Sequence, residues 1–303
     1  MQQQKIFILV ALLITSCSQN KSDTNESGQQ DSQPVKELKI EAVEKFESEE
    51  PASWRNPRVE KIAVKGYYPK FADKHTLLYS TKNYEGLWIF SMADGSTTQI
   101  SDKRGAGYKP AIINDTIIYQ VQSRRKSLEK AILSNREVIE QINSNLDPQR
   151  YLDKQYAGKS TYATVADDLL SIKIIAPDKT YELSPNGKKN YLNAALSPNG
   201  QQLLYEVSGG EAHIANLKGD IKRSLGEVDA PKWVGNDQVL FTVKKDDGMQ
   251  TISSKIYVQD FENDTTFLLT DLNMIENPSI NDAGNIIVAN TPDGGIYLIT
   301  KNK

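Results

Sequence analysis

The stretch "GYYPKFADKHTLLYSTKNYEGLWIFSMADGSTTQIS", residues 66–101, contains four short apolar segments separated by turn residues. The first segment includes Pro69 and an aromatic residue and ends at a turn over 72–74. The other three are "TLLYST", "GLWIFSMADG" and "TTQIS". Gly, Asp and Asn at the boundaries supply the backbone conformations that tight turns need. Four short strands in about 40 residues predict one blade of a β-propeller.

The same order of segments recurs along the chain. Units open at residues 69, 110, 148, 194, 231 and 278, so each spans about 40 residues, within the range of repeat architectures. The sequence therefore predicts an all-β fold, a six-bladed β-propeller of four-stranded antiparallel blades. The third unit departs most from the pattern, because its first strand has to be "QRYLDKQY", residues 149–156.

The sixth unit ends after three strands, which would leave an open sheet edge, and proteins avoid such edges. The segment "RVEKIAVKGYYP", 58–69, precedes the first proline as each outer strand precedes the next. We expect Val59–Val64 to supply the missing strand and close the ring, which gives a propeller domain over 58–303.

Two segments of the sequence allow more than one interpretation. Residues 127–146 have apolar positions near helical spacing, but two strands turning at Asn135-Arg136 keep the repeat in phase, so we favour strands. The pentapeptide Leu-Ser-Pro-Asn-Gly occurs at 183–187 and at 196–200. We expect the first copy to end the outer strand of the third unit. The second should be the turn after the inner strand of the fourth, since Pro-Asn-Gly suits any tight turn.

The N-terminus carries a targeting pattern. Lys5 precedes the apolar run "IFILVALLI", 6–14, which is too short for a membrane-spanning helix and is typical of a secretory signal. It ends in "ITSC", which resembles the lipobox of bacterial lipoproteins, and Cys17 is the one cysteine of the chain. The resemblance implies a signal peptide over 1–16 and a lipidated Cys17. The alternative is an ordinary signal peptide with an incidental cysteine.

A polar segment follows the cysteine. Residues 18–34 contain no apolar side chain, so they should form a flexible tether, and residues 35–51 could be helix, strand or more tether. We assign 17–57 to the lipidated cysteine and tether. Ser18 differs from the Asp signal for inner-membrane retention, which favours the outer membrane facing the periplasm, with surface exposure still open.

The repeats resemble a known family. "YPKFADKHTLLYST", "LWIFSMADG", "LSPNGQQLLYEVS" and "INDAGNIIVAN" are similar to the TolB-like, or PD40, six-bladed propellers of the WD40-like class, over about residues 58–303. TolB carries a further N-terminal domain where this chain has a tether. The resemblance implies an envelope accessory protein that docks other envelope components.

Composition and motifs argue against most catalytic classes. The formal net charge is -3, which gives no general attraction to nucleic acid. The two histidines, His75 and His213, fall in different blades at different strand positions, and no cofactor is expected. The acidic turns at 244–249 and 281–285 offer oxygen ligands for Ca²⁺, but hairpin turns need the same residues. Asp167-Asp168 could suggest acid/base chemistry, although a loop is the favoured reading.

We therefore expect a non-catalytic, lipid-anchored envelope propeller that binds a protein partner, with a glycan as another ligand class. The loops 83–87, 123–130, 153–160 and 244–254 are the expected contact regions. Candidate partner-binding residues are Trp54, Arg124, Arg125, Asp246 and Asp247. Trp54 lies before the first expected strand, and the alternative for it is that it covers a blade edge. The alternative function is an enzyme that acts on a polysaccharide or peptide within the central channel.

Overall fold

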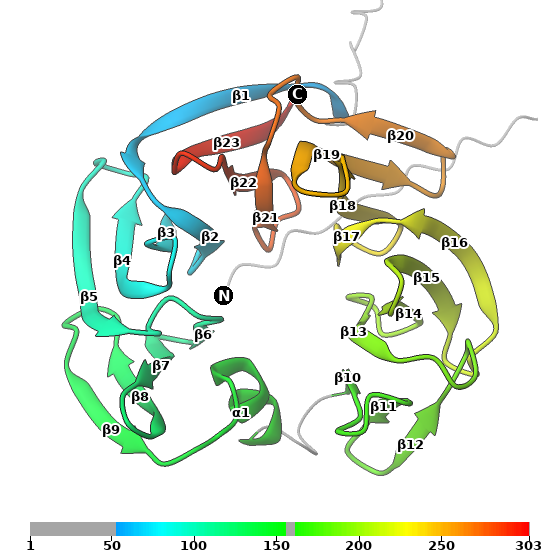
Figure 1. Ribbon diagram of the computed structural model, residues 1–303, viewed down its shortest axis with the longest axis horizontal. Coiled ribbons are helices and arrows are strands. Elements are labelled where there is room, and N and C mark those ends of the chain that lie inside the picture. The colour runs from blue at the N-terminus through cyan, green and yellow to red at the C-terminus, as the bar shows by residue number, and fades with distance from the viewer. Residues whose placement is uncertain (1–52, 156–160, 303) are drawn as a thin grey trace, which may run out of the picture. The chain divides into compact units, whose positions relative to one another are not determined.

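The computed structural model describes residues 53–155 and 161–302, in which six antiparallel sheets follow one another around a ring (Figure 1). This confirms the predicted six-bladed β-propeller. The first blade is β2 (Tyr67–Phe71), β3 (Thr76–Ser80), β4 (Glu85–Ser91) and β5 (Thr97–Arg104). The second is β6 (Ala111–Ile113), β7 (Thr116–Gln122), β8 (Lys126–Ile132) and β9 (Val138–Ile142).

The remaining blades continue in chain order around the ring. The third is β10 (Tyr162–Val165), β11 (Ile172–Ile175) and β12 (Thr180–Leu183). The fourth is β13 (Tyr191–Leu196), β14 (Gln202–Val207), β15 (Glu211–Asn216) and β16 (Ile221–Glu227). The fifth is β17 (Asp229–Trp233), β18 (Gln238–Asp246), β19 (Thr251–Asp260) and β20 (Thr265–Leu268). The sixth is β21 (Glu276–Ile280), β22 (Ile286–Asn290), β23 (Gly295–Asn302) and β1 (Ser53–Lys65).

The ring is closed by the most N-terminal strand, as predicted. β1 runs antiparallel to β23, with Val59 opposite Ile299 and Lys61 opposite Tyr297. The strand begins at Ser53, earlier than the expected boundary at residue 58. This extra length carries Trp54 into the core, and the edge of the sixth blade is covered.

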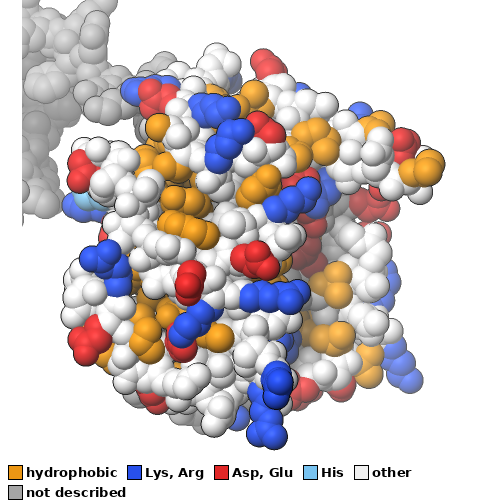
Figure 2. All heavy atoms as spheres, turned by 60° about the vertical axis from the view of Figure 1, so that its left-hand side comes forward, with side chains coloured by type: hydrophobic (Ala, Val, Ile, Leu, Met, Phe, Trp, Pro, Cys, Tyr) orange, Lys and Arg blue, Asp and Glu red, His pale blue; other side chains and the backbone are white. Residues whose placement is uncertain are grey.

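Burial follows the position of a strand within its blade. The second strand of each four-stranded blade is covered by the neighbouring blades on both sides, so it reads as a continuous apolar run, as in "TIIYQ" of β7. The outer strands face solvent instead, and β9 is exposed at four of its five residues. On the side of the ring that carries the first two blades, charged side chains of both signs and hydrophobic groups are interspersed (Figure 2).

The third blade differs from the prediction. Residues expected to form its first strand form a helix, α1 (Pro148–Gln155), and the blade has three strands among the described residues. Asp147 caps the helix, because its Oδ1 accepts the Arg150 N–H at 2.9 Å and its carbonyl accepts the Tyr151 N–H. Pro148 then occupies the first helical position, which proline favours. The prediction of a strand over 149–156 was wrong because it followed the repeat phase and ignored this cap.

Residues 127–146 form strands, as favoured. β8 and β9 are joined by a turn in which Arg136 has a φ of 65°. The alternative of an amphipathic helix is therefore excluded for this segment.

Four blades share a backbone distortion that the sequence pattern did not predict. In each of these blades a proline lies in the innermost strand or, for β6, directly before it, and the residue before the proline has a positive φ: Tyr68 (56°), Lys109 (46°), Ala230 (51°) and Asn277 (53°). In β2, β17 and β21 the register to the second strand shifts at the same place, which is a bulge. Non-glycine residues rarely adopt this conformation, so the innermost strands of these blades are distorted near their N-terminal ends.

Residues 1–52 lie outside the described part of the chain, and with them the predicted signal peptide, Cys17 and most of the tether. Among the described residues, no helix is long and apolar enough to cross a membrane.

Candidate functional site

Antiparallel order brings two kinds of connection to the same face of the ring. These are the turns between the second and third strand of each blade and the connections from one blade to the next. We call this the loop face. The predicted contact loops at 83–87, 123–130 and 244–254 all lie on it. Residues 156–160 of the fourth predicted loop fall outside the described residues.

A group of exposed leucines lies on the loop face over the third and fourth blades. Leu169, Leu170 and Leu192 are 38%, 46% and 57% exposed, and we call them the leucine patch. The backbone N–H of Tyr191 donates to the Leu169 carbonyl at 2.7 Å, and Leu192 is the next residue along the chain. Two segments therefore present their leucines side by side.

The turn that carries two of these leucines is held in place by hydrogen bonds. The Leu170 N–H donates to Asp168 Oδ1 at 3.0 Å, and Ser184 Oγ donates to the Leu170 carbonyl at 3.1 Å. Leu169 has a φ of 64°, which is unfavourable for a residue with a Cβ. A strained turn that holds apolar side chains toward solvent is typical of a binding site.

Tyrosines gather on the loop face over the first blade and its neighbours. Tyr68 and Tyr84 stack with ring centroids 4.1 Å apart, and Tyr108 meets Tyr84 edge-on at 5.2 Å. All three are half-buried. We call these residues the tyrosine cluster. Burial raises the pKa of Tyr84, and the neighbouring Tyr68 adds to this effect.

The cluster is fixed by contacts with loops from two blades. The Tyr68 hydroxyl donates to the Lys82 carbonyl at 3.1 Å, and its backbone N–H donates to Asn290 Oδ1 at 3.1 Å. The Tyr84 carbonyl accepts the Gly107 N–H at 3.2 Å. The rings are therefore held in one arrangement before any ligand arrives.

The innermost strands contribute two equivalent lysines. Lys70 Nζ donates to the Pro110 carbonyl at 3.1 Å, and Lys232 Nζ donates to the Pro278 carbonyl at 2.6 Å. Each lysine thus links its blade to the proline of the next one. Burial away from water lowers the pKa of Lys232 to about 8, and the positive charge of Lys70 also lowers it.

One pair of carboxylates lies on the loop face, between the fourth and fifth blades. Burial raises the pKa of Glu206, and the charge of Asp229 adds to this, while a hydrogen bond from Asn193 opposes it. Asp229 forms an ion pair with Lys244. A carboxyl group with a raised pKa beside a second carboxylate can act as a proton donor.

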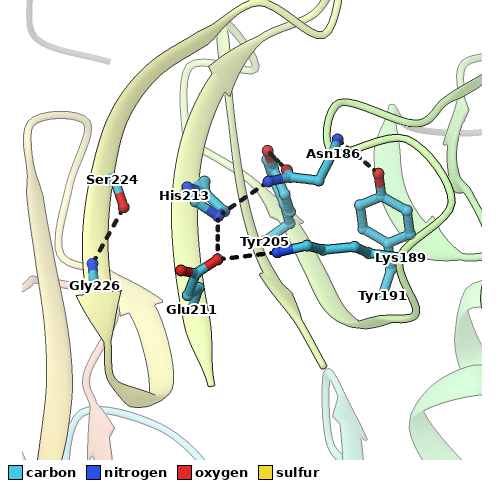
Figure 3. A network of polar contacts seen from close by, with 8 residues as sticks. All are labelled: Asn186, Lys189, Tyr191, Tyr205, Glu211, His213, Ser224 and Gly226. Atoms are coloured by element: carbon cyan, nitrogen blue, oxygen red, sulfur yellow. Dashed lines mark hydrogen bonds and ion pairs between the residues drawn. The ribbon is translucent and has the colours of Figure 1, made fainter. Parts of the chain in front are cut away.

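A polar network ties the connection between the third and fourth blades to the fourth blade (Figure 3). Asn186 Oδ1 accepts the Tyr205 hydroxyl at 2.5 Å, and its Nδ2 lies 3.3 Å from His213 Nε2. Lys189 pairs with Glu211 at 3.2 Å. Burial lowers the pKa of His213, so the imidazole is held neutral. The polar groups of this network are mostly partnered with one another, which indicates that the network has a structural role.

The structure separates the sequence-predicted residues. Arg124 and Arg125 are exposed in the turn between β7 and β8, while Asp246 and Asp247 are exposed at the tip of β18 and β19 on the opposite side of the ring (Figure 1). Asp247 Oδ1 accepts the N–H groups of Met249 and Gln250, each at 2.9 Å. This carboxylate therefore stabilises its own hairpin turn.

Trp54 requires a correction. Its side chain is 1% exposed and packs with residues of the fifth and sixth blades, including Leu240 and Ile287. Lys301 Nζ lies 5.1 Å from the ring centroid. A partner cannot reach this side chain in the described fold, because β1 extends far enough to bury it between two blades.

The other singled-out residues have local roles. His75 lies in the turn after β2, and His213 lies in the third strand of its blade, both as predicted. Asp167 and Asp168 form the turn between β10 and β11. Asn281 Oδ1 accepts the Asn285 N–H at 3.0 Å, which closes the acidic turn at 281–285. Within the described ranges, no group of three His, Cys, Asp or Glu residues is placed to hold a metal ion.

Sequence reasoning missed the leucine patch and the tyrosine cluster. The signal for the first was present, since "DDLL" at 167–170 places two leucines in a polar turn. Tyrosines 68, 84 and 108 are scattered along the chain, and only the fold brings them together.

Comparisons with known proteins add little. No family model matches the sequence, and no curated protein matches it. Among solved structures, the chain is similar to one from the mitotic checkpoint complex, with 8% identity, TM-score 0.44, and coverage of 88% of this chain and 98% of that one. It is also similar to the tricorn protease, with 17% identity, TM-score 0.46, and coverage of 78% and 26%. A third is the Cps50 (Swd1) β-propeller domain of Myceliophteria thermophila, with 10% identity, TM-score 0.45, and coverage of 80% and 99%. The propeller assignment comes from the six sheets themselves.

Proposed function

We propose that this chain is a lipid-anchored, TolB-like propeller of the cell envelope that binds a protein partner through its loop face. The observation that carries the proposal is the leucine patch. Leu169 and Leu170 are exposed in a turn whose conformation is unfavourable at Leu169, and a backbone hydrogen bond joins this turn to β13, which carries Leu192. A protein partner that covered the three leucines would remove their apolar surface from water, which favours binding.

The shape of the loop face also favours a protein. Met249, 96% exposed, stands at the tip of the hairpin formed by β18 and β19, which are among the longest strands of the ring. Apolar groups on raised loops, surrounded by polar ones, are typical of protein–protein contact sites. A small-molecule site would instead require an enclosed apolar pocket with a few converging polar groups.

The anchor is proposed from the sequence. The apolar run over 6–14 and the "ITSC" that follows fit a lipoprotein signal, and Cys17 is the one cysteine in the chain. A lipid at Cys17 would tether the propeller to a membrane, and we propose the outer membrane, with the propeller on its periplasmic side. The segment from 18 to 52 would let the loop face meet a partner at some distance from the lipid surface.

The test is a crosslinked pull-down from intact cells. Native protein is compared with Cys17→Ala and with Leu170→Ser/Leu192→Ser, and the matched control is Ile221→Ser/Leu268→Ser, which changes two comparably exposed residues on outer strands. We expect one stoichiometric envelope partner that is lost with the patch variant, reduced with Cys17→Ala and retained in the control. Recovery of the propeller alone from every sample would overturn the proposal.

The carboxylate pair favours a second candidate function, hydrolysis of a polysaccharide or peptide. Glu206 would donate a proton to the leaving group, since its raised pKa keeps it protonated more readily than an ordinary glutamate. The test is turnover of a panel of polysaccharides and peptides by native protein, Glu206→Gln and the control Glu227→Gln. Turnover that is lost only in Glu206→Gln supports this function, and no turnover by the native protein overturns it.

A further inference from the structure

Positive charge is concentrated on the loop face beside the tyrosine cluster. Five exposed cations lie on the loops of the first and second blades: Lys82, Arg104, Lys109, Arg124 and Arg125. Within the part of the chain that the structure describes, none of the five has an ion-pair partner, although ion pairs form on other blades and between Lys103 and Glu129 of the same two blades. The protein as a whole has a net charge of -3, and one exposed acidic residue, Glu85, lies opposite Arg104, so the excess of positive charge on these loops is local.

The cations and the tyrosines form one continuous surface. The Tyr84 carbonyl accepts the Gly107 N–H, and the Tyr108 N–H donates to the Gly105 carbonyl at 2.9 Å. Gly105 in turn packs against Gln122, the last residue of β7, immediately before the turn that holds Arg124 and Arg125. Lys109 Nζ lies 5.7 Å from the centroid of the Tyr108 ring. The turn that holds the arginines therefore neighbours the connection that carries Tyr108.

The backbone of this surface is constrained. Tyr84 and Lys109 have φ values of 59° and 46°. Ser123 Oγ donates to the Arg125 carbonyl at 2.8 Å and closes the arginine turn. Distorted backbone that presents unpaired charges in a fixed arrangement costs folding free energy, and such cost is found mainly at binding sites.

We infer that this surface, which we call the tyrosine–cation surface, binds an acidic, extended segment of a protein partner. The inference deepens the proposed function and depends on it for the identity of the ligand as a protein. Unpaired arginines and lysines complement aspartate and glutamate side chains. The tyrosine edges and hydroxyls add contact area at little entropic cost, because the rings are already fixed.

The arrangement of the rings favours a peptide over a glycan. Sugars pack on open aromatic faces, but Tyr68 and Tyr84 cover each other at 4.1 Å, and Lys109 lies over Tyr108. The stacking therefore leaves fewer ring faces for a sugar, while the five cations stay exposed. A peptide also fits the leucine patch across the ring, since one protein partner could contact both regions.

The experiment measures binding of a fluorescent oligoglutamate peptide to the full chain in detergent by fluorescence anisotropy. We expect binding that weakens as salt is raised, and a loss of affinity of about tenfold or more in Arg124→Glu/Arg125→Glu. The matched control is Lys218→Glu/Lys222→Glu, which makes the same charge change at exposed positions between and along β15 and β16. This control should bind like the native protein.

The outcomes separate this inference from the proposed function. Loss of affinity in the arginine variant alone supports the inference. Equal binding by both variants overturns it, and so does binding to a sulfated glycan or to anionic vesicles without binding to oligoglutamate. If oligoglutamate does not bind while the pull-down still recovers a partner through the leucine patch, the inference fails and the proposed function stands.

Discussion

Two copies of one pentapeptide, at 183–187 and 196–200, form nearly the same turn in two different places. The Gly187 N–H donates to the Ser184 carbonyl at 2.9 Å, and the Gly200 N–H donates to the Ser197 carbonyl at 2.8 Å. The φ values of the two glycines are 65° and 70°. The local sequence therefore determines the backbone of the turn wherever it occurs.

The two asparagines nevertheless have different roles. On the loop face, Asn186 joins Tyr205 and His213 of the fourth blade, both of which are buried (Figure 3). On the opposite face, Asn199 Oδ1 accepts the Ser197 hydroxyl at 2.7 Å and the Gln201 N–H at 3.1 Å, within its own turn. We therefore expect the two turns to contribute unequally to the stability of the fold, because their tertiary partners differ.

The largest expected effect is the loss of Asn186. In Asn186→Ala the buried Tyr205 hydroxyl loses its partner and His213 Nε2 keeps only the Glu211 carboxylate at 3.8 Å, so we expect the free energy of unfolding to fall by about 2–4 kcal/mol. Asn199→Ala is the control, and it should cost about 1 kcal/mol or less, because Ser197 Oγ still accepts the Gln202 N–H and water can replace the exposed contact to the Gln201 N–H. The measurement is denaturant unfolding of both variants. Equal losses would show that the two turns do not differ.

The second effect is the pH dependence of His213. Burial lowers its native pKa below the ordinary 6.5, with Glu211 opposing and Lys189 reinforcing the shift. As the pH falls through 6.5, the unfolded chain takes up a proton that the native state refuses, so stability declines until the pH passes the native pKa. Each unit of pKa difference costs about 1.4 kcal/mol.

The check compares unfolding free energies of native protein and His213→Gln between pH 8 and pH 5, a range of about three units around the ordinary histidine pKa. The variant should lose the component of the pH dependence that begins near 6.5 in the native protein. An unchanged profile would mean that His213 does not contribute to it. His75 is exposed and serves as the control position through His75→Gln.

A smaller effect is expected when the amide of Asn186 is replaced by a carboxylate. In Asn186→Asp a carboxylate can accept from Tyr205 and from a protonated His213, so the native pKa of His213 should rise. The stability that this adds is present below pH 6.5 and is lost as the pH rises through the new native pKa. NMR titration of the two histidines, assigned with His75→Gln, measures the shift. A pKa that stays low would show that Asn186 does not control the protonation of His213.

The repeat allowed most of the fold to be predicted. Second strands such as β3 and β7 are covered on both faces, so their apolar runs are dense and easily recognised. The closing strand β1 followed from the need to cover an edge. The prediction for the first strand of the third blade was wrong because α1 depends on a local signal. Asp147 caps the helix and Pro148 begins it, and this signal interrupts the repeat.

The functional surface was harder to predict, because its parts are distant in sequence. Tyr68 comes from β2, Tyr84 from the turn between β3 and β4, and Tyr108 from the connection to the second blade, so only the fold brings their rings together. Trp54 was assigned to a contact role because its strand was expected to begin later than it does. Arg124 and Arg125 could be found as a basic turn, but their tyrosine neighbours could not.

The smallest effect tests whether the two turns are alike once the asparagines are set aside. A Cβ added at Gly187 or Gly200 would meet no atom within 4 Å, so only the positive φ resists substitution. We therefore expect Gly187→Ala and Gly200→Ala to lower the free energy of unfolding by the same amount, about 1–2 kcal/mol. Denaturant unfolding of the two variants measures it. Equal losses at the glycines and unequal losses at the asparagines would locate the whole difference in the side-chain partners of Asn186. A larger loss at Gly187 would mean instead that the loop-face turn is strained by the network it supports.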